Sequence, residues 1–314
     1  MATDHVLEVE DLHVWFDLPQ KRELHAVQGI SFSLAAGERL GLVGESGCGK
    51  TTSILALMGL LPPTASVAGR VMLDGKNILE QGESSVAPHR WRDIAMVFQG
   101  AMNAFNPVQP IGEQIAEPMK LHGIARGRAA HERARELLEL VGIPAARAGR
   151  FPHELSGGMR QRAAIAMALA CNPRVLLADE PTTALDVMVQ AQVLDLLVKV
   201  CDESGTALVL VTHDLPIVSQ ICHRAAVMYA GEIAEIGDVN TLIDAPRHPY
   251  TRLLFAATPT LDSDHALSSI AGTPPRLDRE LVGCPFAPRC DVAIERCASE
   301  HPVLHAGARC HHAA

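Results

Sequence analysis

The sequence has few aromatic residues, no excess of positive charge and no long apolar run. Phe, Trp and Tyr make up 4% of 314 residues, and 36 acidic residues outnumber 27 basic ones, giving a formal net charge of −9. A broad nucleic-acid-binding face needs a basic surface, so we expect no nucleic-acid partner. The most apolar segment, residues 53–61, is shorter than the roughly 18 residues of a spanning helix, and Pro62 follows it. The first residues also lack the pattern of a signal peptide, so we expect any work at a membrane to go through a partner.

What is present is an ordinary globular composition, with 48% apolar and 20% charged residues. At about 150 residues per domain, the length predicts two domains, each able to bury a core. Eight cysteines in such a chain do not indicate a secreted disulfide scaffold.

Apolar patterning predicts an α/β protein, in which continuous apolar runs between helices form parallel strands covered on both faces. A shift toward Pro, His and Cys beyond about residue 237 predicts a separate module. The expected strands are residues 7–16, 24–34, 39–43, 94–98, 175–178 and 207–212. Asp74-Gly75 predicts a hairpin turn within residues 71–78, and a terminal hairpin is expected over 224–236. The expected helices are residues 51–61, 129–141 and a segment after Ser156, within a helical region of about 102–170.

A glycine-rich pattern follows the expected strand 39–43. Residues 44–51 read GESGCGKT and fit G-x-x-x-x-G-K-[ST] between a strand and a helix. In such a loop the backbone N–H groups and the helix N-terminus surround phosphate, the lysine contacts the β- and γ-phosphates, and the hydroxyl binds Mg²⁺. The sequence therefore predicts a nucleotide-phosphate site formed by Gly44, Glu45, Ser46, Gly47, Cys48, Gly49, Lys50, Thr51 and Thr52.

Two more patterns carry related chemistry. The expected strand 175–178 ends in Asp179, suited to the Mg²⁺ shell, and Glu180, suited to polarising a water that attacks the γ-phosphate. Residues 155–158 read LSGG at a helix start, which predicts either a second anion-binding site or an ordinary cap with Ser156 as the first residue.

The order of these patterns resembles the ATP-binding cassette (ABC) family, in which LSGG is the signature. The resemblance implies an α/β, ABC-type P-loop ATPase fold, with a RecA-like core, an antiparallel β-subdomain and an inserted helical signature subdomain at about residues 100–170. The cassette would span residues 1–238, followed by a small Cys-rich extension over 239–314. The same resemblance implies that ATP and Mg²⁺ are bound, with Thr51, Gln99 and Asp179 near the metal.

Several single residues match further family positions. Gln99 matches the Q-loop glutamine, although Gly100-Ala101 stands where the family often has Asp-Pro. His213 matches the switch histidine and Asp186 the D-loop aspartate. Phe16 matches the aromatic residue against adenine, with neighbouring Trp15 as an alternative. Glu180, His213 and Gln99 are therefore the expected catalytic residues, and Ser156, Gly157 and Gly158 are expected to act in trans across a head-to-tail dimer.

Three stretches and the tail resemble a narrower group, the ATPase subunits of oligopeptide and dipeptide importers. They are NAFNP at 103–107, EPTTALDVMVQAQ at 180–192 and HPYTR at 248–252. The resemblance implies ATP-powered peptide import, and the group also includes importers of nickel, glutathione and some oligosaccharides. The implied partners are two permease subunits, an extracytoplasmic solute-binding protein and a second, related ATPase, with this chain peripheral on the cytoplasmic face of the membrane. The competing interpretations are a soluble ABC ATPase acting on ribosomes or DNA, and an iron–sulfur sensor with the cassette as its output.

Four cysteines cluster in the tail: Cys284, Cys290, Cys297 and Cys310, spaced C-x5-C-x6-C-x12-C. In a cytosolic chain such clustering favours metal ligation over a disulfide. Structural zinc is usually bound by cysteines spaced C-x2-4-C, whereas four widely spaced thiolates suit an iron–sulfur cluster. Members of the importer group carry a tail that resembles a [4Fe–4S] site. Zinc with help from His301, His305, His311 or His312, and unliganded thiols, remain as alternatives.

The other four cysteines are outside the tail. Cys171, Cys201 and Cys222 lie on expected helical segments and are interpreted as core residues. Cys48 lies in the phosphate loop near Lys50 and a helix N-terminus, and we hypothesise that these surroundings lower its pKa and make it reactive.

Overall fold

The computed structural model describes residues 5–100, 104–183, 185–257, 270–279 and 281–313. The chain divides into two compact units, each assembled from three separate stretches. The first unit comprises residues 1–7, 34–38 and 73–210, and the second comprises 8–33, 39–72 and 211–314. Each unit is described by itself below.

In the first unit, three short buried strands lie in one sheet in the order β8, β7, β6. They are β6 (Ile94–Val97), β7 (Val175–Asp179) and β8 (Ala207–Val211), and every residue in them is buried. β6 and β7 are parallel, with Ile94 opposite Val175. Continuous apolar runs had predicted such strands, and the structure confirms them. Parallel neighbours bring the segments that follow β6 and β7 to the same edge of the sheet.

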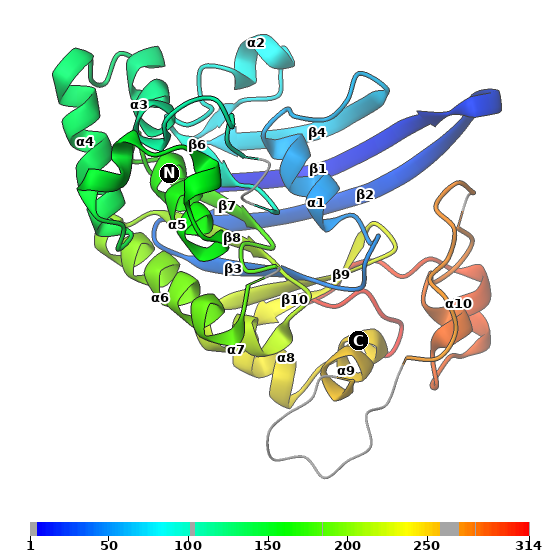
Figure 1. The fold of residues 1–314 in the computed structure, drawn as a ribbon. Coiled ribbons are helices and arrows are strands. Elements are labelled where there is room, and N and C mark those ends of the chain that lie inside the picture. The colour runs from blue at the N-terminus through cyan, green and yellow to red at the C-terminus, as the bar shows by residue number, and fades with distance from the viewer. Residues whose placement is uncertain (1–4, 101–103, 184, 258–269, 280, 314) are drawn as a thin grey trace. The chain divides into compact units, whose positions relative to one another are not determined.

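Helices form the rest of this unit. α3 (Ile111–Leu121), α4 (Gly127–Leu140) and α5 (Gly157–Ala168) pack against one another, as the teal and green helices of Figure 1 show. Ile111, Ile115 and Met119 recur every four residues and form the buried stripe of α3. Gly142, at φ 73°, follows the end of α4, where a left-handed conformation commonly ends a helix. The remaining elements are α2 (Glu83–Val86), β5 (Lys76–Asn77), the short 3-10 turns Ala145–Gly149 and Pro152–Glu154, and α6 (Val187–Ser204), which contacts α5.

The second unit contains parts of two sheets. In the first, β1 (His5–Leu18) lies between β2 (Arg22–Ala35) and β4 (Ala65–Leu73), and β1 and β2 form the long blue ribbon of Figure 1. In the second, β3 (Arg39–Val43) is parallel to β9 (Arg224–Tyr229), and β9 is antiparallel to β10 (Glu232–Asp238). The hairpin expected over 224–236 is therefore confirmed. α1 (Lys50–Leu57) follows β3 and ends earlier than the helix expected over residues 51–61. α7 (Leu215–Ile221) contacts β3, and α8 (Val239–Asp244) contacts β9, β10 and α7.

The segment after β10 is hydrogen-bonded to the same unit. It contains α9 (Pro249–Ala256), the 3-10 turn Ala287–Arg289 and α10 (Glu295–Ser299). Near its end the chain runs beside β10, where Ile236 N–H donates to Gly307 O at 2.7 Å and Arg309 N–H donates to Ala234 O at 2.8 Å. These bonds satisfy backbone groups along β10, which would otherwise be the free edge of this sheet.

An aromatic cluster provides the apolar anchor of this tail. The rings of Tyr229, Tyr250 and Phe286 have centroids 4.6 to 5.3 Å apart, and all three side chains are buried. Tyr229 ends β9, Tyr250 is in α9 and Phe286 precedes the 3-10 turn, so one cluster joins three separate segments. Aromatic contacts of this geometry add to the stabilisation that burial provides.

No helix among the described residues has both the length and the apolar character needed to cross a membrane.

His248 is a buried titratable group at the start of α9. Its side chain is 4% exposed, and its Nδ1 accepts a hydrogen bond from Tyr250 N–H at 3.0 Å. Burial lowers the pKa of His248 to about 4, against 6.5 for an exposed imidazole. The native state therefore holds this ring neutral, whereas the unfolded chain protonates it below pH 6.5.

This difference predicts a pH-dependent stability. The free energy of unfolding is unaffected by His248 titration above pH 6.5, where the ring is neutral in both states. It falls as the pH drops from 6.5 toward 4, because the unfolded chain then gains a proton that the native state does not, and the total loss is about 3 kcal/mol. We expect the unfolding free energy of H248N to fall less steeply over that interval than that of the wild type, because asparagine does not titrate. Urea unfolding of both proteins between pH 7.5 and 4.5 measures the difference in slope, and equal slopes would contradict the assignment.

Candidate functional site

The phosphate loop lies in the second unit, between β3 and α1. Gly49 occupies the position before the helix with φ 104°, and a Cβ atom there would lie 2.6 Å from the carbonyl oxygen of Ala26. Any other residue would therefore clash with backbone while adopting a strained conformation. Ser46 and Gly47, at the tip of the loop, and Thr51, in the first turn of α1, are exposed. The loop thus has the strand–loop–helix context that the motif requires.

Lys50 is the charged centre of this loop. It is 7% exposed, and its ammonium group donates hydrogen bonds to the carbonyl oxygens of Gly44 at 2.7 Å and Glu45 at 3.0 Å. A buried ammonium group is tolerable only when its donors are satisfied, which these carbonyls achieve. The arrangement holds a positive charge inside the loop, where an anionic phosphate would meet it.

The structure also shows contacts to the loop that sequence reasoning missed. Glu45 N–H donates to the hydroxyl of Tyr250 at 2.9 Å, and its carboxylate pairs with Arg289. Both partners lie in the tail. The HPYTR stretch contains Tyr250, but nothing in its spacing indicated contact with a loop 205 residues earlier in the chain.

The hypothesis that the pKa of Cys48 is lowered is wrong. Burial raises the pKa of its thiol, and this effect exceeds the opposing one of the Lys50 ammonium, whose Nζ lies 3.7 Å from the sulfur. Cys48 is only 5% exposed, so the sequence-based argument gave too much weight to the nearby charge. The core interpretation of the other cysteines holds, since Cys171, Cys201 and Cys222 are all buried.

In the first unit, the structure brings together two residues predicted to be catalytic. Glu180 follows Asp179 at the end of β7 and has φ 42°, an uncommon conformation for a non-glycine residue. Gln99 Nε2, from the segment after β6, donates to Glu180 Oε2 at 2.8 Å. Thr183 Oγ1 donates to the same oxygen at 2.9 Å, a contact that the sequence did not indicate. Asp179 is 2% exposed, so a buried carboxylate precedes a more accessible and oriented one.

The LSGG and D-loop residues form the starts of two helices of the first unit. Ser156 caps α5, its hydroxyl accepting from Met159 N–H at 3.3 Å, so the cap interpretation is confirmed. Asp186 caps α6, accepting from Val189 N–H at 3.0 Å. A Cβ atom on Gly158 would lie 2.5 Å from Val189 Cγ1, so the two helix starts are in close contact. Ser156, Gly157 and Asp186 remain exposed and accessible to a partner.

Trp15, rather than Phe16, lines a cavity of the second unit. This cavity, of about 290 Å³, also has His25 and Gln28 in its wall together with residues 277–279 and 281 of the tail. Trp15 stacks on His25 at a centroid distance of 4.7 Å and on His13 at 5.2 Å. Neighbouring residues of a strand point to opposite faces, so Phe16 points away from this stack. His213, the expected switch histidine, is exposed after β8.

The four tail cysteines are free thiols. Burial, with smaller contributions from the neighbouring Cys297 and Cys310, raises the pKa of Cys284 to about 11. Cys284 N–H also donates to Cys297 O at 2.8 Å. Yet among all described residues, no three His, Cys, Asp or Glu side chains are close enough to hold a metal ion. The expectation of a preformed four-cysteine metal site is therefore not supported.

Three residues of the sequence patterns described above, Ala101, Asn103 and Ala184, lie outside the described residues.

Comparison with known proteins agrees with this geometry. A family model described as ABC transporter matches residues 27–183, and one described as oligopeptide/dipeptide transporter, C-terminal region, matches residues 234–297. The chain belongs to the ABC transporter family. It is 46% identical to the probable peptide ABC transporter ATP-binding protein y4tR of Sinorhizobium fredii, over 96% of this chain and 91% of that protein.

Other members of the family are similarly close. The identity is 45% to the oligopeptide transport ATP-binding protein OppD of Escherichia coli and 44% to the dipeptide transport ATP-binding protein DppD of Bacillus subtilis; these matches cover 96% and 95% of this chain and 90% of each relative. Among solved structures, the dimeric ATP-binding cassette MJ0796 bound to ADP and phosphate matches with a TM-score of 0.66 and 28% identity, over 74% of this chain and 98% of that one. The cassette fold is thus shown independently of the motifs.

The buried state of Cys48 predicts slow alkylation. In the native protein we expect iodoacetamide to label Cys48 at least about tenfold more slowly than in urea, because few thiolates form and access is blocked. Peptide mass spectrometry over a time course measures each site separately. Cys48 of the urea-unfolded chain provides the reference rate, and labelling of native Cys48 at that rate would contradict the prediction.

Proposed function

We propose that this chain is the ATP-hydrolysing subunit of an importer for peptides. The observation that carries the proposal is the oriented carboxylate of Glu180, with Gln99 and Thr183 donating to one oxygen, in a chain that also has a complete phosphate loop. Similarity over nearly the whole length to proteins named as peptide importer ATPases supports the choice of cargo class.

The residues divide the chemistry among them. The phosphate loop, Gly44 to Thr52, binds the ATP phosphates, with Lys50 supplying positive charge. Thr51, Asp179 and Gln99 provide the oxygen ligands that Mg²⁺ prefers. Glu180 orients and deprotonates the attacking water, and His213 contacts the γ-phosphate. Trp15 or Phe16 contacts the adenine ring. Ser156, Gly157, Gly158 and Asp186 act on the nucleotide of a second cassette.

The assembly follows from that division of roles. We propose that residues 1–238 form the cassette and 239–314 the extension, and that the chain pairs with a second, related ATPase. Two permease subunits and an extracytoplasmic solute-binding protein complete the importer, with this chain on the cytoplasmic face of the membrane. Capture of the tagged chain from its host's membranes, with mass spectrometry of what is recovered, tests these partners, and recovery of ribosomal proteins alone would contradict them.

Removal of the proposed base tests the chemistry. We expect E180Q to lower ATP turnover by about 100-fold or more while MgATP still binds, because the amide keeps the shape of the side chain but accepts no proton. Steady-state phosphate release and equilibrium binding of a fluorescent ATP analogue measure the two effects separately.

The matched control is E203Q, which removes an exposed carboxylate on α6 and which we expect to leave turnover unchanged. Undiminished turnover in E180Q would remove Glu180 from its proposed role. Loss of peptide uptake in cells carrying E180Q, with uptake retained in E203Q, would connect hydrolysis to transport.

We also propose that the tail cysteines bind a metal centre, a [4Fe–4S] cluster or alternatively Zn²⁺. What supports the proposal is the donor chemistry: Cys297 and Cys310 lie near enough to contribute to the raised pKa values of Cys284 and Cys290, and thiolates are ligands of both centres. Binding would require these side chains to move closer together, since they do not form a ligand set as they stand.

Metal analysis of the full chain, purified without oxygen, decides among the alternatives. Iron with broad visible absorption indicates a cluster, stoichiometric zinc without colour indicates a zinc site, and the absence of both metals indicates unliganded thiols. We expect C284S to lose most of the bound metal, whereas C201S, a buried cysteine of α6, retains it. Equal metal content in the two variants would contradict ligation by the tail.

A further inference from the structure

Two tail residues hold one residue of the phosphate loop. Arg289 Nη1 donates to Glu45 Oε2 at 2.7 Å, and Nη2 donates to Glu45 Oε1 at 2.9 Å. Tyr250 accepts the backbone N–H of the same Glu45 at 2.9 Å. Both the side chain and the backbone of Glu45 are thus held from a part of the chain more than 200 residues away. Paired arginine–carboxylate bonds of this kind fix geometry as well as charge.

Arg289 is itself held firmly. Its side chain is 4% exposed, and its remaining donors bond Ala271 O at 2.9 Å, Ile270 O at 3.3 Å and the Tyr229 hydroxyl at 3.3 Å. Its guanidinium carbon also lies 5.7 Å from the centre of the Tyr229 ring. Because these partners hold the buried guanidinium in place, it also fixes the position of the Glu45 carboxylate.

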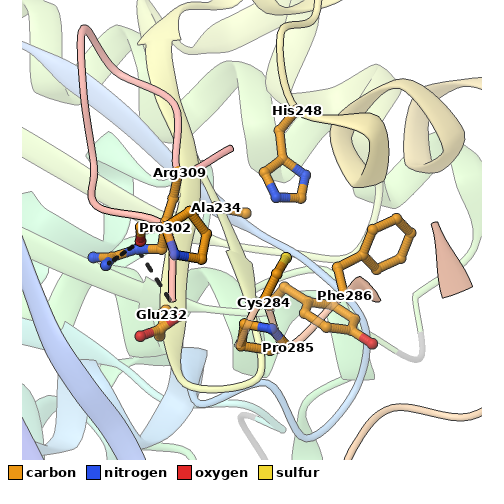
Figure 2. Close-up of a pocket in the computed structure, with 9 residues that line it drawn as sticks. Glu232, Ala234, His248, Cys284, Pro285, Phe286, Pro302 and Arg309 are labelled. Atoms are coloured by element: carbon orange, nitrogen blue, oxygen red, sulfur yellow. Dashed lines mark hydrogen bonds and ion pairs between the residues drawn. The ribbon is translucent and has the colours of Figure 1, made fainter. Parts of the chain in front are cut away.

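The position of Arg289 depends on the cysteine-containing segment. Arg289 ends the 3-10 turn that begins after Phe286, and Cys284 and Cys290 flank that turn. Phe286 is buried against Tyr229 and Tyr250. Figure 2 shows Cys284, Phe286 and His248 around one small cavity, with the Glu232–Arg309 contact beside it. The packing of this segment therefore determines where the guanidinium lies.

The charge of Glu45 makes its position matter for nucleotide binding. Glu45 follows the first glycine of a loop that must receive the negative phosphates of ATP, and its carboxylate is only partly buried, at 26% exposed. Unpaired, that carboxylate would repel the phosphates, and rotation toward Lys50 would compete with them for the ammonium group. In the pair with Arg289, the charge of the carboxylate is neutralised and its position is fixed by two hydrogen bonds.

We propose that Arg289 is a positioning residue for ATP binding, which neutralises Glu45 and holds it away from the phosphates. The tail thereby contributes to the nucleotide site through Glu45. This inference rests on the proposed function, because it assumes that the loop binds ATP.

The test compares R289Q in two backgrounds. In the wild-type background we expect R289Q to raise the Kd for MgATP by about tenfold, with a matching rise in KM and a smaller change in kcat. In the E45Q background we expect the same substitution to change the Kd less than about twofold, because no carboxylate remains to repel the phosphates. Binding of a fluorescent ATP analogue to the purified full chain gives all four Kd values.

The controls separate positioning from folding. R296Q removes an exposed tail arginine that pairs with Glu300, and we expect it to leave the Kd unchanged. R289K keeps the charge without the paired geometry, and we expect an intermediate Kd. Thermal unfolding of each variant identifies any that fail to fold, in which case R289K and its E45Q counterpart provide the same comparison.

The outcomes distinguish the two proposals. An equal loss of affinity from R289Q in both backgrounds, or no loss in either, would overturn the positioning role of Arg289 while leaving ATP binding intact. Failure of the wild-type chain to bind MgATP, with no further effect of K50A, would overturn the proposed function and this inference together.

Discussion

A phosphate loop has to keep its backbone N–H groups available for an anion, and this constraint organises the surrounding structure. Groups reserved for a ligand cannot stabilise the loop, so stabilisation has to come from elsewhere. Here Lys50 bonds two carbonyls of the loop, while Gly231, in the turn between β9 and β10, donates its N–H to Cys48 O at 3.0 Å. The aromatic cluster of the tail adds Tyr250 to this support.

The carboxylate of Glu180 is positioned in a different way from the phosphate loop. Glu180 and Gln99 come directly after neighbouring parallel strands, so the sheet itself brings their segments to one edge. Gln99 and Thr183 then fix the direction of the carboxylate with two donors on one oxygen. Glu180 is therefore positioned by strand order in the first unit, and the phosphate loop by long-range contacts in the second. A substitution in the tail is expected to act on the loop, whereas a substitution in the buried strands acts on Glu180.

Sequence reasoning succeeded where the signal is local. The runs 94–98, 175–178 and 207–212 are continuously apolar, and such runs between helices form buried strands. The cap formed by Ser156 could be predicted because capping depends on residues within one turn. The phosphate loop itself was equally predictable, since its glycines and Lys50 occupy fixed positions between a strand and a helix.

Properties that depend on burial or on contacts distant in sequence could not be predicted. Cys48 has a charged neighbour in sequence, yet its pKa follows the surrounding packing, which no local pattern reveals. The pairing of Arg289 with Glu45 spans 244 residues, and neither residue belongs to a pattern that names the other.

The second unit is assembled from separate stretches of the chain, and one of them extends beyond residue 238. Its stretches 8–33, 39–72 and 211–314 fold as one body, so a fragment ending at residue 238 would contain every motif of the family and still lack part of that body. The presence of all the motifs therefore does not show that such a fragment can fold. The segment beyond the proposed cassette boundary at residue 238 thus completes the core of this unit, because Tyr250 and Phe286 pack against Tyr229 of β9.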